Sequence, residues 1–317
     1  MPIPRVIHQT WKDRAIPEEW RDFQKTWERH HPDWTYRLWT DADLLRFVET
    51  EFPAFLATFN AYSYAIQRVD AARYLILHRY GGVYADLDIE CLRPLDPLLK
   101  ERDFAIAAEP AIHAQWVGAE RLLCNAFMAS APRHPFLSAI VAELGRTEPR
   151  ILLHSEVLTT TGPAMVARVA RAFGLDETCV LDAATVYPFA SNSSELNALR
   201  SGARKPVHMR NEALRRGAYA IHYWSNTWVK NLAGALRNPR PHDVPGYLFH
   251  PGRDSVGFDI GNVGRDIEVL ARECTADARA VAFNTDGFLK HELRPAAQWT
   301  HIDNADGNEG LYVKIGP

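Results

Sequence analysis

The fold of this chain is decided by one stretch of sequence, Gly81-Gly82-Val83-Tyr84-Ala85-Asp86-Leu87-Asp88. A glycine pair ends an apolar, helix-like segment, and a short strand-like segment that ends in two carboxylates follows it. Side chains on a strand alternate between its two faces, so we expect Tyr84, Asp86 and Asp88 to share one face and apolar residues to share the other. Two acids at a strand end can hold a divalent cation against a phosphate, as sites for nucleotide-linked substrates require.

The composition is that of a soluble globular protein. The chain has 317 residues, of which 47% are hydrophobic and 24% charged, and its formal net charge of -3 gives no strong field for nucleic acid. No signal peptide precedes the strand-like start, and no run reaches the ~18 apolar residues of a membrane span. We therefore expect a cytoplasmic protein whose contact with the inner face of a membrane is peripheral at most. The four cysteines form no CxxC pair, which favours reduced thiols.

Upstream and downstream of the opening stretch, strand-like and helix-like segments alternate, which predicts an α/β unit with a mainly parallel sheet. Strands are expected at 6–9, 35–39, 104–108, 180–181, 186–187 and 220–224. Helices are expected from 17 to about 31, from 41 to 48, and at 61–80, 135–144 and 163–173.

The texture of the sequence changes at 238–246, where three prolines in seven residues indicate a linker. We therefore predict a large domain over 1–237 and a small α+β appendage over 246–317. In the appendage, Asp286-Gly287 and Asp306-Gly307 are hairpin-turn signals. Strands near 280–283 and 311–315 and a helix near 266–272 complete the expected elements.

The helix before the glycine pair carries Asp70 and Arg73, three residues apart and so on one face. Two interpretations of Arg73 follow from its position. It pairs with Asp70 across one helical turn, or its forked guanidinium reaches a phosphate or sugar hydroxyl of a ligand. Tyr84 likewise has two interpretations, because it is either part of the core or a ligand contact beside the two acids.

Several motifs in order around these residues resemble glycosyltransferase family 32, and the resemblance covers about residues 2–236. The Asp, Arg, Tyr and paired Asp spacing is also similar to that in the glucosyltransferase domains of large clostridial toxins. The segments that carry the likeness are Ile3–Trp11, Pro32–Tyr36 with Trp39 and Asp41, Asp70–Tyr74, Gly81–Asp88, Asn125–Met128, Thr161–Pro163, and Ile221–Trp224 with Trp228.

The resemblance implies a GT-A fold, a Rossmann-like sheet that binds a nucleotide-sugar, and a retaining transfer. It implies catalytic roles for Asp70, Arg73, Asp86 and Asp88, with Mn²⁺ or Mg²⁺ as the cofactor. Asp88 would bind the metal directly, and Asp86 would contact the donor and the metal through water. His222 is either a strand histidine satisfied by a backbone carbonyl or a third metal ligand, and a nitrogen ligand would favour Mn²⁺.

The resemblance and the positions of strand ends also imply contacts to the nucleotide-sugar, for which a UDP-sugar is favoured. Trp11 is either a base-stacking ring or a capped core residue, and Trp228 is either a loop residue that closes over the donor or interface packing. The implied donor contacts are Gln9, Thr10, Trp11, Asp70, Arg73, Tyr84, Asp86, Asn125 and Trp228. The acceptor is expected to be a glycan or a glycolipid.

Two further segments have less specific patterns. A basic stretch is either a solvated face or a contact for an anionic acceptor or lipid headgroup. It contains Arg200, Arg204, Lys205, Arg210, Arg215 and Arg216. The appendage has a weak likeness to PAN/apple-type modules, which bind glycans or proteins, and a purely structural cap is the other interpretation.

Two other classes of function compete with sugar transfer. A phosphohydrolase would use Asp86 as nucleophile and Asp88 as acid, but the haloacid-dehalogenase pattern requires Thr or Val where this chain has Glu90. A carbohydrate-binding protein that has lost catalysis is the other alternative, and the intact Asp70 and Arg73 oppose it.

Overall fold

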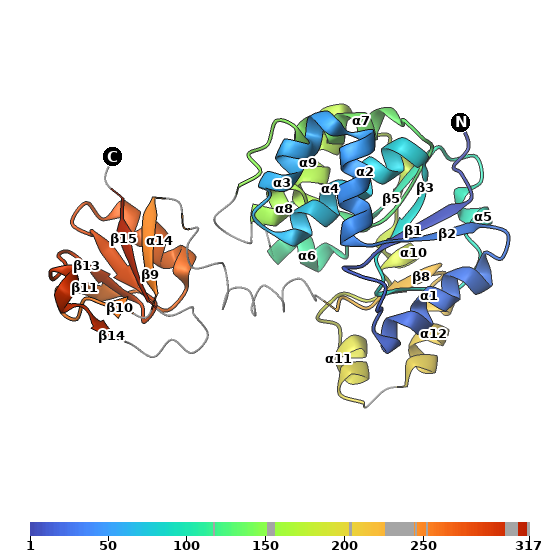
Figure 1. Cartoon of the computed structure of the whole chain (residues 1–317). Helices are drawn as coiled ribbons and strands as arrows, with labels where there is room; N and C mark the ends of the chain where they lie inside the picture. The colour runs from blue at the N-terminus through green and yellow to red at the C-terminus, as the bar shows by residue number, and fades with distance from the viewer. Residues whose placement is uncertain are drawn as a thin grey trace. The chain divides into compact units, whose positions relative to one another are not determined.

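A computed structural model of the chain describes residues 1–116, 118–150, 156–202, 205–225, 244, 246–251, 253–301 and 310–315. The described residues up to 225 form one compact unit and those from 244 onward form a second (Figure 1). Each unit has its own hydrophobic core. Among the described helices, none combines the length and the apolar character that crossing a bilayer demands.

The first unit alternates strands and helices, as the sequence predicts. Its elements are β1 (Val6–Thr10), α1 (Glu18–His30), β2 (Thr35–Trp39), α2 (Asp41–Glu51), α3 (Leu56–Ala61), α4 (Ala65–Tyr80), β3 (Gly82–Ala85), β4 (Ile89–Cys91), α5 (Asp96–Leu99), β5 (Phe104–Ala108), α6 (Ala111–Trp116), β6 (Leu123–Ser130), α7 (Pro135–Leu144), α8 (Val157–Thr160), α9 (Pro163–Phe173), β7 (Val180–Leu181), α10 (Ala183–Val186), α11 (Ser194–Arg200), α12 (Pro206–Arg215) and β8 (Ala220–His222).

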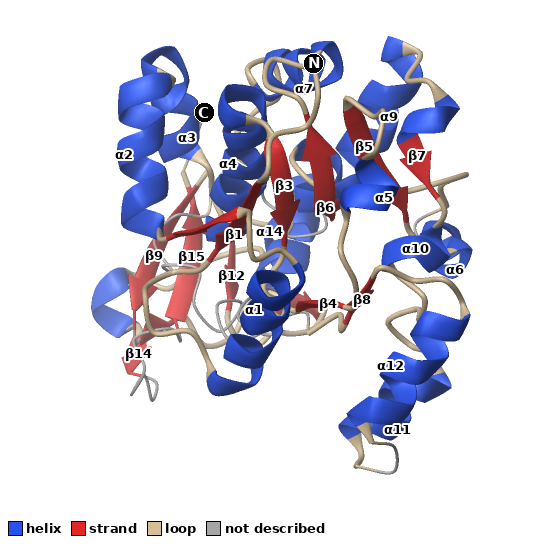
Figure 2. Cartoon of the chain, turned by 90° about the vertical axis from the view of Figure 1, so that its right-hand side faces the viewer, coloured by secondary structure: helices blue, strands red, loops and turns tan. Residues whose placement is uncertain are grey.

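Six strands form the central sheet in the order β2-β1-β3-β6-β5-β7. Figure 2 shows β1, β3, β6, β5 and β7 in this order. The pairs β1–β2, β1–β3 and β5–β7 are parallel, whereas β6 is antiparallel to both of its neighbours. The predicted α/β class with a mainly parallel sheet is confirmed, and the arrangement is consistent with a GT-A fold. Because β6 runs in the opposite direction, the ends of β1, β3 and β5 and the beginning of β6 lie at one edge of the sheet.

Helices cover both faces of this sheet. One face packs against α2, α4, α7 and α9, with Tyr84 and Met128 from the strands in the same core. The other face packs against α1, α10 and α12, with Val83 and Phe127 from the same two strands. Strands covered on both faces need mostly apolar side chains on both faces, which fits β6, where every residue is buried and all but Asn125 and Ser130 are apolar.

A buried histidine joins three segments beside the opening stretch. His8 on β1 accepts a hydrogen bond from Trp39 Nε1 at 3.1 Å through Nδ1, and its Nε2 lies 3.1 Å from the carbonyl of Gly81. Burial lowers the pKa of His8 to about 4, so the ring is neutral near pH 7 and its Nε2–H donates to Gly81. The ring therefore fixes β2 and the glycine turn to β1.

The glycine pair is required by the backbone and by crowding. Gly81 has φ of 66° and Gly82 has φ of 94°, which side-chain-bearing residues rarely adopt. A β-carbon at Gly82 would lie 2.4 Å from Val6 Cγ1 and 2.5 Å from Val6 O. The chain can therefore turn from α4 into β3 beside β1 only because these positions carry no side chain.

The structure corrects the prediction that Tyr84, Asp86 and Asp88 lie on one strand, although the Tyr84 hydroxyl does meet Asp86. β3 ends at Ala85, and the chain then turns, with the N–H of Ile89 donating to the carbonyl of Asp86 at 3.0 Å. Leu87 packs with Ile16 and Trp20, away from the core that holds Val83. The two acids therefore lie on a turn, where strand alternation does not apply.

Two element predictions are also wrong. The helix expected at 61–80 begins later, as α4 at Ala65, because α3 ends at Ala61 and the Tyr64 N–H donates to the side chain of Gln67 at the new helix start. The strand expected at 186–187 is the end of α10, which Asp182 caps through the N–H of Ala184. Asx capping competes with extended structure at such short segments.

The second unit is an α+β fold. Its elements are β9 (Tyr247–Pro251), β10 (Arg253–Asp254), β11 (Asp259–Asn262), α14 (Ile267–Ala276), β12 (Ala282–Asn284), β13 (Phe288–Lys290), β14 (Thr300–His301) and β15 (Gly310–Lys314). Five strands form an antiparallel sheet in the order β11-β13-β12-β15-β9, and Leu270 and Cys274 of α14 pack against Phe283 and Tyr312. The predicted turn at Asp286-Gly287 joins β12 to β13, whereas Asp306-Gly307 and most of the linker lie outside the described residues.

Replacement of Gly82 by alanine tests the turn. We expect Gly82→Ala to lower the free energy of unfolding by about 2 kcal/mol or more, because the methyl group meets Val6 and the backbone conformation is also strained. Gly174→Ala is the matched control, since Gly174 has φ of 72° and open space around it, and should cost about 1 kcal/mol. Urea denaturation measures both, and equal losses would contradict the crowding argument.

Candidate active site

The site lies at the sheet edge where β1, β3 and β5 end. Asp86 follows β3, and Asp88 immediately precedes β4, which pairs with β8 in a small two-stranded sheet. In that pairing Ile89 lies opposite His222, so the side chains of Asp88 and His222 meet, with Asp88 Oδ1 3.1 Å from His222 Nε2. The Ser225 N–H donates to Asp88 Oδ2 at 2.8 Å, which fixes the carboxylate.

Three potential metal ligands converge here. Asp86, Asp88 and His222 each offer one ligand atom, and these atoms lie within 4.8 Å of one another. His222 Nδ1 is buried and has no hydrogen-bond partner among the described residues. A buried polar atom left without a partner is unusual in a folded protein and fits a group that is bound there. Two carboxylates and an imidazole suit Mn²⁺ better than an all-oxygen set does.

The charges of the three groups are coupled. Burial raises the pKa of Asp86, although Arg73 opposes that shift. Burial would raise the pKa of Asp88 as well, but His222 and the Ser225 hydrogen bond hold it below its usual value. Burial opposes protonation of His222, yet Asp88 outweighs it and raises the pKa of His222. A divalent cation would therefore replace the His222 proton as the counter-charge of the two acids.

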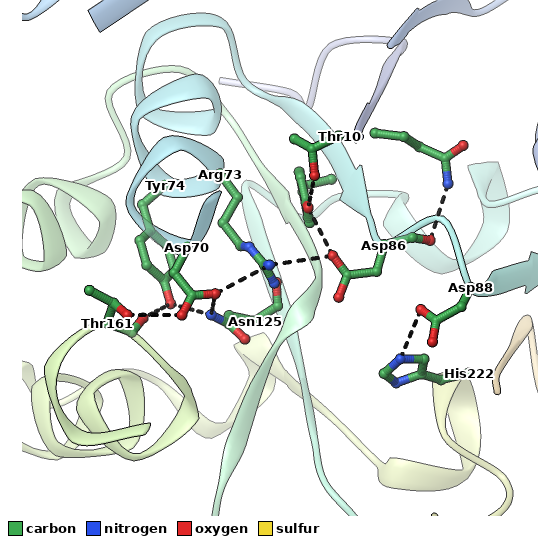
Figure 3. A network of polar contacts seen from close by, with 11 residues as sticks. Thr10, Asp70, Arg73, Tyr74, Asp86, Asp88, Asn125, Thr161 and His222 are labelled. Carbon is green, nitrogen blue, oxygen red and sulfur yellow. Dashed lines mark hydrogen bonds and ion pairs between the residues drawn. The ribbon is translucent and has the colours of Figure 1, made fainter. Parts of the chain in front are cut away.

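Arg73 is at the centre of the polar network beside these acids (Figure 3). Its side chain is almost fully buried, with Nη2 3.2 Å from Asp70 Oδ1 and 3.4 Å from Asp86 Oδ1. Its Nη1 donates to the backbone carbonyl of Asn125 at 2.9 Å. Arg73 thus pairs with Asp70 on its own helix and also contacts the first acid of the D-x-D sequence.

The carboxylate of Asp70 accepts hydrogen bonds from side chains on β6 and on the turn between α8 and α9. Thr161 Oγ1 donates to Asp70 Oδ2 at 2.9 Å, and Asn125 Nδ2 donates to Asp70 Oδ1 at 3.0 Å and to the Tyr74 hydroxyl at 2.7 Å (Figure 3). Burial raises the pKa of Asp70 to about 6, while Arg73 and Thr161 oppose that increase. The carboxylate is therefore ionised near pH 7 with several donors around it.

The predicted donor contacts on β1 and β3 position Asp86. Tyr84 is fully buried, and its hydroxyl donates to Asp86 Oδ1 and accepts from Thr10 Oγ1, both at 2.8 Å. Gln9 Nε2 donates to the carbonyl of Asp86 at 3.1 Å. Direct contact of these side chains with a donor stays a prediction.

The two tryptophans predicted to contact the donor have different outcomes. Trp11 follows β1 at the site edge and packs edge-on against Trp20, with ring centroids 4.7 Å apart. It is partly exposed, so both the stacking and the core interpretations stay open. Trp228 lies outside the described residues, and its role stays a prediction.

Sequence reasoning missed several residues that shape the site. Thr161 and Tyr74 stood within the family-like segments, but spacing alone did not connect them with Asp70. Ser225 follows the His222 strand and acts through its backbone. Arg200 lies in the basic stretch, and its guanidinium donates to the carbonyls of Tyr223 and Trp224 at 3.1 and 3.0 Å.

Most other basic residues of that stretch form ion pairs within the first unit. Arg210 pairs with Glu90, and Arg215 and Arg216 both pair with Glu212. Lys205 is exposed, and Arg204 lies outside the described residues.

Known proteins match the part of the chain that holds this site. The family model "Glycosyltransferase sugar-binding region containing DXD motif" matches residues 17–105. Inositol phosphoceramide mannosyltransferase 1 of Schizosaccharomyces pombe is 39% identical over 170 residues, which are 52% of this chain and 50% of that protein. Mannosyl phosphorylinositol ceramide synthase CSH1 of Saccharomyces cerevisiae is 40% identical over 168 residues, 53% of this chain and 42% of that protein.

A solved structure, the PaToxG glycosyltransferase, is 15% identical with a TM-score of 0.40 and covers 69% of this chain and 89% of that one. A likeness at this level adds nothing to the interpretation. The chain spans about half the length or less of the two curated relatives. The sequence matches nonetheless confirm the resemblance to DXD-containing glycosyltransferases of family 32.

Removal of the Thr161 hydroxyl tests the Asp70 network. A lost hydrogen bond to a charged group costs about 1.5–3 kcal/mol, and here that cost applies when Asp70 is ionised. The pKa of Asp70 is about 6 in the folded protein, above its unfolded value, so Asp70 contributes less to the free energy of unfolding as the pH rises through 6. Thr161→Ala removes a donor to the carboxylate and therefore raises this pKa further.

We therefore expect Thr161→Ala to lower the free energy of unfolding more at about pH 7.5 than at about pH 5. Thr161→Ser keeps the hydroxyl and is the matched control, because the loss of its buried methyl group should lower stability by the same amount at both pH values. Urea denaturation at the two pH values measures the difference, and a pH-independent loss would show that Thr161 does not act through Asp70.

Proposed function

We propose that the first unit is a metal-dependent, retaining glycosyltransferase that moves a hexose from a nucleotide-sugar to a hydroxyl of a glycolipid or glycan. The observation that carries this proposal is the convergence of Asp86, Asp88 and His222 beside the Asp70–Arg73 pair at one sheet edge. The names of the relatives favour mannose as the transferred hexose and an inositol phosphoceramide as the type of acceptor.

The residues of the site supply the charges that such a transfer needs. Asp86, Asp88 and His222 would hold Mn²⁺ or Mg²⁺, and the cation would neutralise the departing diphosphate. Arg73 adds a permanent positive charge beside Asp86. Asp70 is an acceptor for hydroxyl groups of the transferred sugar, since each carboxylate oxygen has more than one lone pair.

Retention of the anomeric configuration follows if the acceptor hydroxyl attacks the anomeric carbon from the same side on which the diphosphate leaves. The acceptor oxygen forms its bond to the anomeric carbon as the bond to the diphosphate oxygen breaks, and the hydroxyl proton passes to the departing phosphate. Such a step needs no carboxylate nucleophile beneath the sugar ring. Asp70 and Arg73 then bind and orient the sugar and form no covalent bond to it.

A donor-hydrolysis screen tests the proposal. Purified protein is incubated with UDP-, GDP- and dTDP-sugars, including UDP-glucose and GDP-mannose, with Mn²⁺, Mg²⁺ or EDTA. Turnover is expected only with a divalent cation, and Asp88→Asn should reduce it roughly 100-fold because the metal site loses a charged ligand. Asp96→Asn is the matched control, since Asp96 is exposed on α5 and pairs with Arg5.

The outcomes separate the competing functions. Metal-dependent turnover that survives Asp88→Asn would refute the metal site. Phosphate release from simple esters without sugar release would favour a phosphohydrolase, and glycan binding without donor turnover would favour a binding protein. Proton NMR of the first-formed product should show the anomeric configuration of the donor, and an inverted product would refute retention.

The third ligand is tested by metal preference. Replacement of the imidazole nitrogen by oxygen in His222→Asp should lower the ratio of Mn²⁺ to Mg²⁺ affinity, because nitrogen ligands favour Mn²⁺ relative to Mg²⁺. His208→Asp makes the same substitution at an exposed position on α12 and controls for the added negative charge. Titration calorimetry with each cation measures the ratio, and an unchanged ratio would exclude His222 as a ligand.

A further inference from the structure

Helix α6 lies at the same sheet edge as the two acids. β5 is antiparallel to β6, and β6 is antiparallel to β3, so β5 and β3 run in the same direction. The chain leaves β5 at Ala108 and enters α6 at Ala111. The helix therefore begins at the same edge of the sheet as Asp86, with β6 between the two strands that lead there.

Trp116 ends this helix with its side chain exposed. Its exposed fraction is 53%, which is the highest among the Trp, Tyr and Phe residues whose burial the structure describes. One face of the indole stacks on His113, with ring centroids 4.9 Å apart and an interplanar angle of 28°. The ring is thus supported on one side and accessible on the other.

His113 is a rigid support for that indole. It is buried, its Nε2 accepts a hydrogen bond from the Ser191 N–H at 3.0 Å, and its Nδ1–H donates to Glu109 Oε2 at 2.8 Å. Both ring nitrogens are therefore engaged, which fixes the tautomer and the orientation of the ring. Preorganised aromatic surfaces bind without a large loss of side-chain entropy.

A continuous series of ring contacts connects this support to the metal-ligand group. The rings of His113 and Trp224 pack edge-on with centroids 4.6 Å apart, and the centroids of Trp224 and His222 are 4.1 Å apart. Trp224 is fixed in turn, because its Nε1 donates to the carbonyl of Phe189 at 2.8 Å and it adopts a positive φ of 49°. The exposed indole is therefore two intervening rings from a candidate metal ligand.

We propose that Trp116 is an acceptor subsite, a platform on which a hydroxylated six-membered ring of the acceptor stacks. This inference rests on the proposed function, because transfer requires an acceptor hydroxyl at the edge where the donor diphosphate is held. Sugar and inositol rings have an apolar C–H face that packs on an aromatic ring while their hydroxyls remain at the rim. The subsite recognises this shared chemistry, and both kinds of ring are used as probes.

The test compares Trp116→Ala, Trp116→Phe and wild-type protein. Methyl α-D-mannopyranoside and myo-inositol are the probes, and each is measured as a binding partner by saturation-transfer NMR and as an acceptor in transfer from the nucleotide-sugar. For whichever probe binds, Trp116→Ala should raise the Kd and the acceptor KM roughly tenfold. Trp116→Phe should raise both constants less than about threefold. Donor hydrolysis without acceptor should stay unchanged in both variants.

Phe173→Ala is the matched control, because Phe173 is an exposed aromatic residue on α9. It should leave both probes unaffected. The proposal is overturned if neither probe binds the wild-type protein, or if Trp116→Ala leaves Kd and acceptor KM unchanged. It is also overturned if that variant loses binding to anionic lipid vesicles while the soluble probes bind as before, which would make Trp116 a membrane contact. Absence of donor hydrolysis in the wild type, with ring binding that depends on Trp116, would refute the proposed function and support the subsite.

Discussion

A buried cation, the guanidinium of Arg73, is the constraint on which the site depends. An uncompensated charge at this depth would be prohibitively costly, so carboxylates and carbonyls must surround it. Asp70, Asp86 and the carbonyl of Asn125 do so, and they come from α4, the end of β3 and the start of β6. Compensation of one charge therefore ties together the three elements that form the middle of the site.

The site is oriented by neutral hydrogen-bonding groups as much as by charges. His8 remains uncharged near pH 7 and joins β2, β1 and the turn at Gly81. Tyr84 then transmits the position of β1 to Asp86, because its hydroxyl bonds to both Thr10 and the carboxylate. These contacts come from the protein itself, so Asp86 is oriented by β1 and β3 toward the candidate metal ligands.

The local part of this arrangement was accessible from the sequence. The helix, glycine pair and strand around Gly81 are encoded within neighbouring residues, and three-residue spacing was enough to pair Asp70 with Arg73. The turn at Leu87 was not predictable, because it depends on packing against Ile16 and Trp20 far away in the sequence. The bond from Thr161 to Asp70 and the approach of His222 to Asp88 likewise depend on how distant segments meet, which residue spacing does not encode; for His222, only the family resemblance supplied the clue.

The separation of these segments along the chain has a consequence for the family region itself. Residues 17–105 contain the two acids and Arg73, but not β1, β6 or β8. A fragment with those limits would lack the strands on both sides of β3, the Asn125 carbonyl and His222, the third candidate metal ligand. The segment that the family model matches is thus a sequence signature rather than an autonomous module, because the strands that flank β3 lie outside it.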